Sequence, residues 1–296
     1  MTAHQHGAHG TERRLAWALG LAATYMGAEA VGGWWTGSLA LLADAGHMLA
    51  DVFALSLSLL AARLARRPAG SQQTYGHHRT EVLAAMTNGI LLVGVAFLVV
   101  NEALDRIGTS RDILGGPMVA IATGGLAVNF VGLWILRSGS RENLNIRGAW
   151  LHVASDALGS IGAITAGILI WAFGWTWADP AASVLIATLI VYASWTLLRE
   201  AVAVLMEWAP AHVEVTQVEE SILGLDEVSA VHDLHVWTIS SGRIALSGHV
   251  VSTPGCNRDK LLQDVSDLLH ERFQIEHSTI QIETEDFDEP GGVCFT

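Results

Sequence analysis

Residues 37–51 read GSLALLADAGHMLAD, and they place ionisable side chains inside an otherwise apolar stretch. The stretch belongs to Ser38–Leu64, which is long enough to cross a bilayer, since a spanning helix needs about 20 mostly apolar residues. Ionisable residues inside such a helix are costly and usually functional. His47 and Asp51 are four residues apart, so they share one helix face. The sequence therefore predicts a membrane helix with a polar site built into it.

A second apolar segment repeats this spacing. Residues 150–156 read WLHVASD, so His152 and Asp156 also form a His-x-x-x-Asp pair. Two such helices facing each other offer two imidazoles and two carboxylates, a tetrahedral set that suits Zn²⁺. Magnesium and calcium prefer all-oxygen ligands, and copper(I) prefers sulfur. Each pair is otherwise explained as a local hydrogen bond, but two equal pairs in two segments favour a metal transport site.

The composition indicates a membrane protein. Hydrophobic residues make up 51% of the 296 residues and charged residues only 15%, against roughly 25% charged residues in an ordinary soluble domain. Because lipid cannot satisfy backbone polar groups, we expect helical spans. Six stretches are long and apolar enough to be transmembrane helices: Leu15–Trp35, Ser38–Leu64, Val82–Ala103, Gly116–Leu136, Trp150–Phe173 and Ala181–Leu198.

The charge is distributed unevenly. Residues 1–205 contain equal numbers of basic and acidic residues, so the whole net charge of −13 lies in residues 206–296. Together with the six apolar stretches and the histidines near the start of the chain, this distribution predicts a histidine-containing tail (1–12), a six-helix transport domain (13–205) and an acidic cytoplasmic domain (206–296). Such an acidic domain is a poor match for nucleic acid, whose phosphates require basic residues.

Arginines in the connections predict the orientation. Ten lie on the side of both termini and two, Arg106 and Arg111, lie on the other side. By the positive-inside rule, both termini are cytoplasmic in a multi-pass protein of the inner (plasma) membrane. Cys256 and Cys294 are the two cysteines in the sequence, so there is no disulfide framework.

The acidic domain alternates helical and strand patterns. We expect a helix over Val213–Leu223, strands over Val228–Ser240 and Arg243–Ser252, a helix over Arg258–Phe273, and a strand over Ser278–Glu283. This order suits an α+β sheet with helices on one face, of the ferredoxin-like kind.

Three further features have two interpretations each. Asp44, three residues before His47, is either an outer partner of the metal ligands or part of a metal path. Glu29 in the first span either lines that path or bonds across helices. The histidine-rich start, residues 4–9, either binds metal loosely or is a disordered leader.

Three motifs carry a resemblance to a known family: Gly37–Asp51, Tyr75–Glu81 (YGHHRTE) and Val231–Trp237 (VHDLHVW). With them, the chain resembles the cation diffusion facilitator family, and its zinc-transporting (zinc/cadmium/cobalt efflux) subgroup in particular. The resemblance covers nearly the whole chain. It implies a homodimer in membrane lipid that exports zinc, and cadmium or cobalt by the same route, against protons by alternating access.

The resemblance also implies functional residues. His47, Asp51, His152 and Asp156 match the transport site. Cytoplasmic metal-binding positions in similar proteins match His232, His249, His277 and Glu283, so Zn²⁺ is expected as substrate and as regulatory ligand, with no organic cofactor. Strand alternation agrees in part: it puts His249 on the face away from the core, Glu283 outward in phase with His277, and His232 and His235 on opposite faces.

Weaker candidates complete the predicted sites. In the loop between spans two and three, His77 and His78 are either ligands of a second metal or solvated loop residues, and Gly70 and Gln73 stand where partner ligands are sought. Cys294 offers an additional thiolate to the cytoplasmic site.

Proton exchange also follows from the residues. Metal affinity of a histidine site falls on protonation, so an emptied site can carry protons back. The alternative functions are an intramembrane zinc hydrolase and a membrane-anchored metal sensor. A hydrolase needs an open coordination position, whereas four protein ligands close the site, and the chain has no HExxH motif.

Overall fold

The structure is a computed structural model. It describes residues 20–21, 23–65, 70–107, 109, 112–137, 144–240 and 242–287. Inside the helices, the description does not extend to the side chains of residues 55, 58, 59, 62, 65, 144–149, 151 and 152. The chain divides into two compact units, Met1–Leu57 with Thr87–Leu198, and Ser58–Met86 with Arg199–Thr296.

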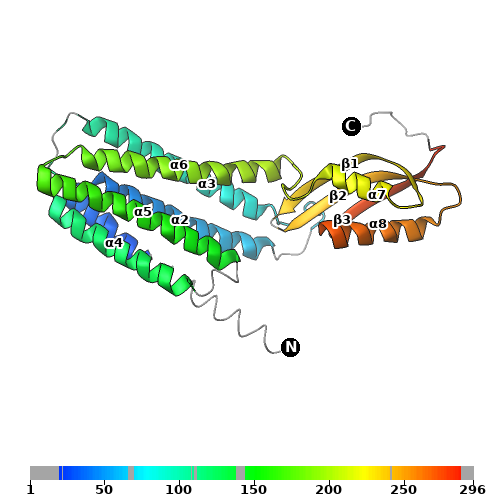
Figure 1. The fold of residues 1–296 in the computed structure, drawn as a ribbon, viewed down its shortest axis with the longest axis horizontal. Coiled ribbons are helices and arrows are strands. Elements are labelled where there is room, and N and C mark those ends of the chain that lie inside the picture. The colour runs from blue at the N-terminus through cyan, green and yellow to red at the C-terminus, as the bar shows by residue number, and fades with distance from the viewer. Residues whose placement is uncertain are drawn as a thin grey trace, which may run out of the picture. The chain divides into compact units, whose positions relative to one another are not determined.

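Long helices dominate the first part of the chain (Figure 1). Helical residues 23–36 lead through a turn at Gly37, where φ is +71°, into α2. The helices that follow are α2 (Leu39–Ala65), α3 (Thr80–Arg106), α4 (Gly115–Leu136), α5 (Leu144–Phe173) and α6 (Ala178–Leu205).

Four helical segments in the described residues are long and apolar enough to cross a membrane: Thr80–Arg106, Gly115–Leu136, Val153–Phe173 and Ala178–Leu205. They correspond to four of the predicted spans. The first predicted span begins outside the described residues. The second forms α2, which is helical throughout but carries the ionisable residues of the opening motif. Six spans therefore stay a prediction.

Small residues let these helices approach closely. Ala40, Ala96 and Ala163 are fully buried in the helical core. One close crossing joins the backbones of α4 and α5: a Cβ added to Gly115 would lie 2.8 Å from the backbone nitrogen of Trp171 and 2.9 Å from the carbonyl oxygen of Gly167. Such small-residue contacts are typical of membrane helices, where dispersion contacts replace the hydrophobic effect between helices.

Two exposed tryptophans mark the start of α6 and a point ten residues before its end. Trp177 immediately precedes α6 and is 61% exposed, and Trp195 within it is 67% exposed. Their separation of 18 residues corresponds to about 27 Å of helix, close to the ~30 Å hydrocarbon core of a bilayer. Tryptophan is enriched at both membrane interfaces. The spacing fits a helix that crosses a bilayer.

The C-terminal part is a small α+β fold, and its element order was predicted correctly. It comprises α7 (Val215–Leu223), β1 (Val228–Ser240), β2 (Arg243–Ser252), α8 (Arg258–Phe273) and β3 (His277–Thr284). Helix α8 begins at the N-cap Asn257, whose side chain accepts a hydrogen bond from the Lys260 backbone nitrogen, and ends at Gln274 in the left-handed conformation.

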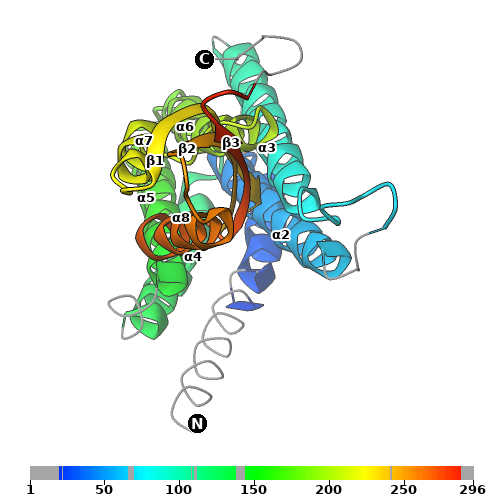
Figure 2. The ribbon, with the colours of Figure 1, turned by 90° about the vertical axis from the view of Figure 1, so that its right-hand side faces the viewer.

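One mixed sheet joins the three strands in the order β1-β2-β3. β1 and β2 form an antiparallel hairpin, whereas β2 and β3 are parallel and need the crossover through α8. Both helices lie on one side of the sheet (Figure 2). Their buried residues, such as Ile222 and Val265, pack with Leu246 and Val250 of β2. The other face of the sheet is free of helices within the described chain.

Candidate functional site

Two helices bring predicted ligands together in the membrane part. The Nε2 atom of His47 on α2 lies 3.6 Å from Oδ2 of Asp51 and 3.6 Å from Oδ1 of Asp156 on α5. These separations exceed hydrogen-bond lengths. They are close to the ~3.3 Å that two ligands of one tetrahedral Zn²⁺ would have at bond lengths of about 2.0 Å. His47 thus lies close to one predicted carboxylate ligand on its own helix and to a second on α5.

The fourth predicted ligand, His152, lies on α5 one turn before Asp156. Its side chain is outside the described part of the structure, so its position in the set stays a prediction.

More buried carboxylates lie near these predicted ligands. Asp44 is 4% exposed and Glu29 is 1% exposed. A Cβ on Gly159 of α5 would lie 3.6 Å from Oδ1 of Asp44, so Asp44 faces α5. Glu29 interacts electrostatically with Asp44 and Asp156. Buried carboxylates are costly in a membrane interior, and this group therefore marks a polar region continuous with the proposed ligands.

Two polar residues that the sequence did not single out as site residues, Arg106 at the end of α3 and Asp179 at the start of α6, lie next to the start of α2. The Asp179 side chain is fully buried and its Oδ2 lies 3.4 Å from Nη1 of Arg106. The sequence signal was an acidic residue two positions before the predicted sixth span, which alone suggests ordinary helix capping.

In the C-terminal part, three of the four predicted ligands form a cluster. His232 Nε2 lies 3.1 Å from one carboxylate oxygen of Glu283, and His249 Nδ1 lies 2.9 Å from the other. One ligand atom from each residue falls within 4.8 Å of the others. Glu283 is only 5% exposed, beside the two imidazoles. It lies on the sheet face away from the helices, as predicted, but it is not open to solvent.

A β-bulge corrects one prediction. His232 pairs with His249 and His235 pairs with Ser247, so two residues of β1, Asp233 and Leu234, oppose the single residue Gly248 of β2. The extra residue is accommodated by Asp233, whose φ is +50°. Cross-strand partners share a face, and His249 and Ser247 are two residues apart. His232 and His235 therefore lie on the same face, and the prediction of opposite faces was wrong.

His277 lies apart from the three-residue cluster. It pairs with Ala245 at the beginning of β3, six residues from Glu283, which corresponds to about 20 Å along a strand. Its ring contacts Tyr75 edge-on at 5.7 Å. The structure therefore does not bring His277 to the same metal position within one protomer.

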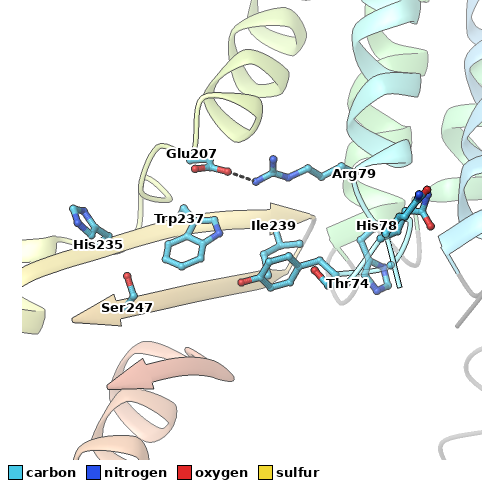
Figure 3. A pocket seen from close by; sticks show the side chains of 12 residues that line it. Thr74, His78, Arg79, Glu207, His235, Trp237, Ile239 and Ser247 are labelled. Atoms are coloured by element: carbon cyan, nitrogen blue, oxygen red, sulfur yellow. Dashed lines mark hydrogen bonds and ion pairs between the residues drawn. The ribbon is translucent and has the colours of Figure 1, made fainter. Parts of the chain in front are cut away.

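The loop before α3 borders a pocket of about 580 Å³ with β1 and β2 (Figure 3). Arg79 pairs with Glu207 at 2.7 Å, and His78 Nε2 accepts a hydrogen bond from Arg243. Neither His77 nor His78 belongs to the described metal-ligand cluster. The geometry does not assemble a second metal site around the loop histidines among the described residues.

Of the two cysteines, Cys256 lies within the described residues and Cys294 lies outside them. Partial burial, and then the Glu227 carboxylate that accepts the thiol hydrogen bond, raise the pKa of Cys256. Cys294 and the histidine-rich N-terminus lie outside the described residues.

Comparison with known protein families identifies both parts of the chain. Residues 15–206 match the cation efflux transmembrane domain, and residues 210–285 match the cation efflux protein cytoplasmic domain.

Full-length relatives agree with these matches. The zinc transporter ZitB of Escherichia coli is 44% identical over 273 residues, 92% of this chain and 87% of that protein. The metal cation efflux system protein CzcD of Cupriavidus metallidurans is 42% identical over 93% of this chain and 87% of its own. A cadmium, cobalt and zinc/H(+)-K(+) antiporter of Bacillus velezensis is 41% identical over 95% of this chain and 91% of its own.

A solved structure, the metal-bound C-terminal domain of the CzcD transporter, is 38% identical, with 24% of this chain and 99% of that chain covered at a TM-score of 0.23. The family matches and the full-length relatives cover most of the sequence and confirm the resemblance seen in its motifs. The chain therefore belongs to the cation efflux family and is a membrane transporter, not an enzyme.

Proposed function

We propose that this protein is a secondary transporter that exports zinc from the cytoplasm in exchange for protons, with cadmium and cobalt as secondary substrates. The observation that carries the proposal is the position of His47 Nε2, 3.6 Å from carboxylates on two different helices. The names of its relatives, which include zinc, cadmium and cobalt carriers and an H(+)-coupled antiporter, support the choice of substrate.

The proposed transport site consists of His47, Asp51, His152 and Asp156. Two nitrogen and two oxygen ligands suit tetrahedral Zn²⁺ better than Mg²⁺ or Ca²⁺, which prefer oxygen alone. Zinc binding requires neutral imidazoles and ionised carboxylates, so binding and protonation exclude each other. Because the ligands come from both α2 and α5, a small relative movement of these helices opens the site to one side or the other, as alternating access requires.

The proposed topology has six spans with both termini on the cytoplasmic side of the inner membrane. The arginine asymmetry of the connections and the spacing of the exposed Trp177 and Trp195 support it. The acidic domain, of the ferredoxin-like kind, then faces the compartment from which zinc is collected.

For the cytoplasmic domain we propose a regulatory zinc site at His232, His249 and Glu283, in a homodimer. The match to a cytoplasmic domain family named for dimerisation supports the dimer. Zinc at this site would compensate the negative charge of the buried Glu283 carboxylate. The loss of that charge would reduce the repulsion between the two acidic domains of the dimer.

Transport in proteoliposomes tests the main proposal. With zinc on the cytoplasmic face and an imposed pH gradient, wild-type protein should move zinc one way and protons the other. Asp156→Asn should abolish both fluxes while zinc binding by the cytoplasmic domain persists. Glu200→Gln, a matched change of an exposed carboxylate on α6, should transport normally.

Two outcomes would contradict the proposal. Normal transport by Asp156→Asn would exclude the assigned site. Absence of zinc flux in the wild-type protein, with zinc still bound by its cytoplasmic domain, would favour the membrane-anchored sensor instead.

A further inference from the structure

The first turn of α2 is capped by Asp179, which lies in the first turn of α6. The backbone nitrogens of Leu39 and Ala40 donate to the two carboxylate oxygens of Asp179, at 2.8 and 3.1 Å. The Ser38 hydroxyl donates to Asp179 at 2.6 Å. The first N–H groups of a helix have no partner inside it, and Ser38, Leu39 and Ala40 are all buried. Asp179 therefore supplies acceptors that neither the helix nor water supplies.

Arg106 from α3 balances this buried carboxylate. Its Nη1 atom lies 3.4 Å from Asp179 and also donates to the carbonyl oxygen of Gly37 at 2.6 Å. Gly37 occupies the left-handed turn that leads into α2. The guanidinium group thus holds the turn before α2, while Asp179 holds its first residues. One buried cluster joins the start of α2, the end of α3 and the start of α6.

The same cluster relates the two halves of the proposed transport site. His47 and Asp51 follow Leu39 by 8 and 12 residues, which is about 12 and 18 Å along a rigid helix. The partner carboxylate, Asp156, lies on α5, which reaches α6 through residues 174–177 alone. Anchoring α2 to the beginning of α6 therefore sets its height and axial rotation against the α5–α6 pair.

We infer that Asp179 is a positioning residue for metal transport, which fixes α2 so that His47 and Asp51 meet Asp156 at the spacing that Zn²⁺ requires. The inference rests on the proposed transport site. Asp179 does not contact the metal. Its role is to keep the cage at the size of a small ion, since supporting residues of metal ligands typically change metal affinity about 10–100-fold when removed.

The test compares zinc and cadmium transport in proteoliposomes. Asp179→Asn replaces one acceptor oxygen by an NH₂ group that faces backbone donors, and leaves Arg106 without its buried counter-charge. We expect the KM for zinc to rise about tenfold, with kcat less affected. The zinc-to-cadmium ratio of kcat/KM should fall, because the loosened site admits the larger ion. A purely structural residue would change the amount of folded protein without changing this ratio.

Two further variants make the result decisive. Asp105→Asn removes an exposed carboxylate on α3 beside Arg106 and should behave as wild type. Ser38→Ala removes one hydrogen bond of the cap and should shift KM and the metal ratio in the same direction, but less. If Asp179→Asn does not fold, Ser38→Ala decides by these two readings.

A wild-type KM and metal ratio in the folded Asp179→Asn protein, or in Ser38→Ala where Asp179→Asn does not fold, would overturn the inference. That outcome leaves zinc transport by wild type and Asp105→Asn intact. Failure of the proposed function is distinguishable, because wild type and Asp105→Asn would then not transport zinc.

Discussion

Glu283 is a carboxylate buried by the residues that bind it. Besides the two imidazoles, the Gln281 side chain donates to it at 2.7 Å, so its oxygens are held in place before any metal arrives. A buried charge requires a compensating partner. Either protons on the histidines or a cation between the three side chains supplies this partner.

Replacing Glu283 therefore tests the cytoplasmic site. In full-length protein whose transport site is disabled by Asp156→Asn, Glu283→Gln should weaken zinc binding by more than roughly tenfold, since one of three ligands is lost. Isothermal titration calorimetry measures this change. His277→Ala should bind zinc like its parent, because His277 lies at the other end of β3. An equal loss in both variants would contradict the three-residue site.

Cys256 offers a pH-dependent readout at the residue scale. Burial and the Glu227 carboxylate raise its pKa, so the reactive thiolate forms only at higher pH than for an ordinary cysteine. In a Cys294→Ser background, iodoacetamide should label Cys256 slowly at pH 8. Glu227→Gln should shift the rate profile to lower pH, whereas the exposed Glu276→Gln should not. An unchanged profile in Glu227→Gln would exclude this carboxylate as a cause.

At the scale of elements, strand and helix limits were predictable where their signals are local. β1, β2 and α8 begin and end at the predicted residues. Alternation and the left-handed Gly242 between the strands fix the hairpin, and Asn257 marks the start of α8. The bulge at Asp233 was not predictable, because it depends on one residue adopting a left-handed conformation inside a regular pattern.

Two other differences have separate causes. His277 and Glu283 share a face of β3, but their separation of six residues, about 20 Å along a strand, already excludes a shared metal position within one protomer. Helical spacing joined His47 to Asp51, whereas the capping of α2 by Asp179 depends on packing that no local pattern encodes.

The α4–α5 crossing supports a prediction at this scale. Gly115→Ala places a methyl group 2.8 Å from a backbone nitrogen of α5, which cannot move aside without separating the helices. We expect a loss of about 1–3 kcal/mol in stability. Gly116→Ala is the matched control, since its nearest neighbour would be a Trp171 ring atom at 3.9 Å. Thermal unfolding of both purified variants compares them, and equal midpoints would contradict the close approach.

For the whole molecule, the decisive property is that the net charge of −13 lies in residues 206–296. Two such domains in a dimer repel each other at separations up to the Debye length, about 8 Å at physiological ionic strength. Zinc bound at each proposed three-residue site would reduce that repulsion. We therefore propose that the acidic charge makes association of the domains responsive to zinc.

Distance measurements between spin labels test this response. A label at Gln263→Cys, exposed on α8, in a cysteine-free background should report a shorter distance between the two subunits of the dimer when zinc is added. Glu283→Gln should remove the response, and high salt should reduce it. An unchanged distance in the wild-type background would return the acidic residues to a role in solubility.

The cap of α2 has a consequence for how the protein is made. Asp179 follows Leu39 by 140 residues. At synthesis rates of 5–20 residues per second, roughly 7–28 s pass between the appearance of α2 and that of its capping residue. During this interval the backbone N–H groups in the first turn of α2 lack their Asp179 acceptor. The final position of α2 is therefore reached only after the last membrane helix has been inserted. Completion of the helical bundle is therefore a late, post-insertion step in the biogenesis of this transporter.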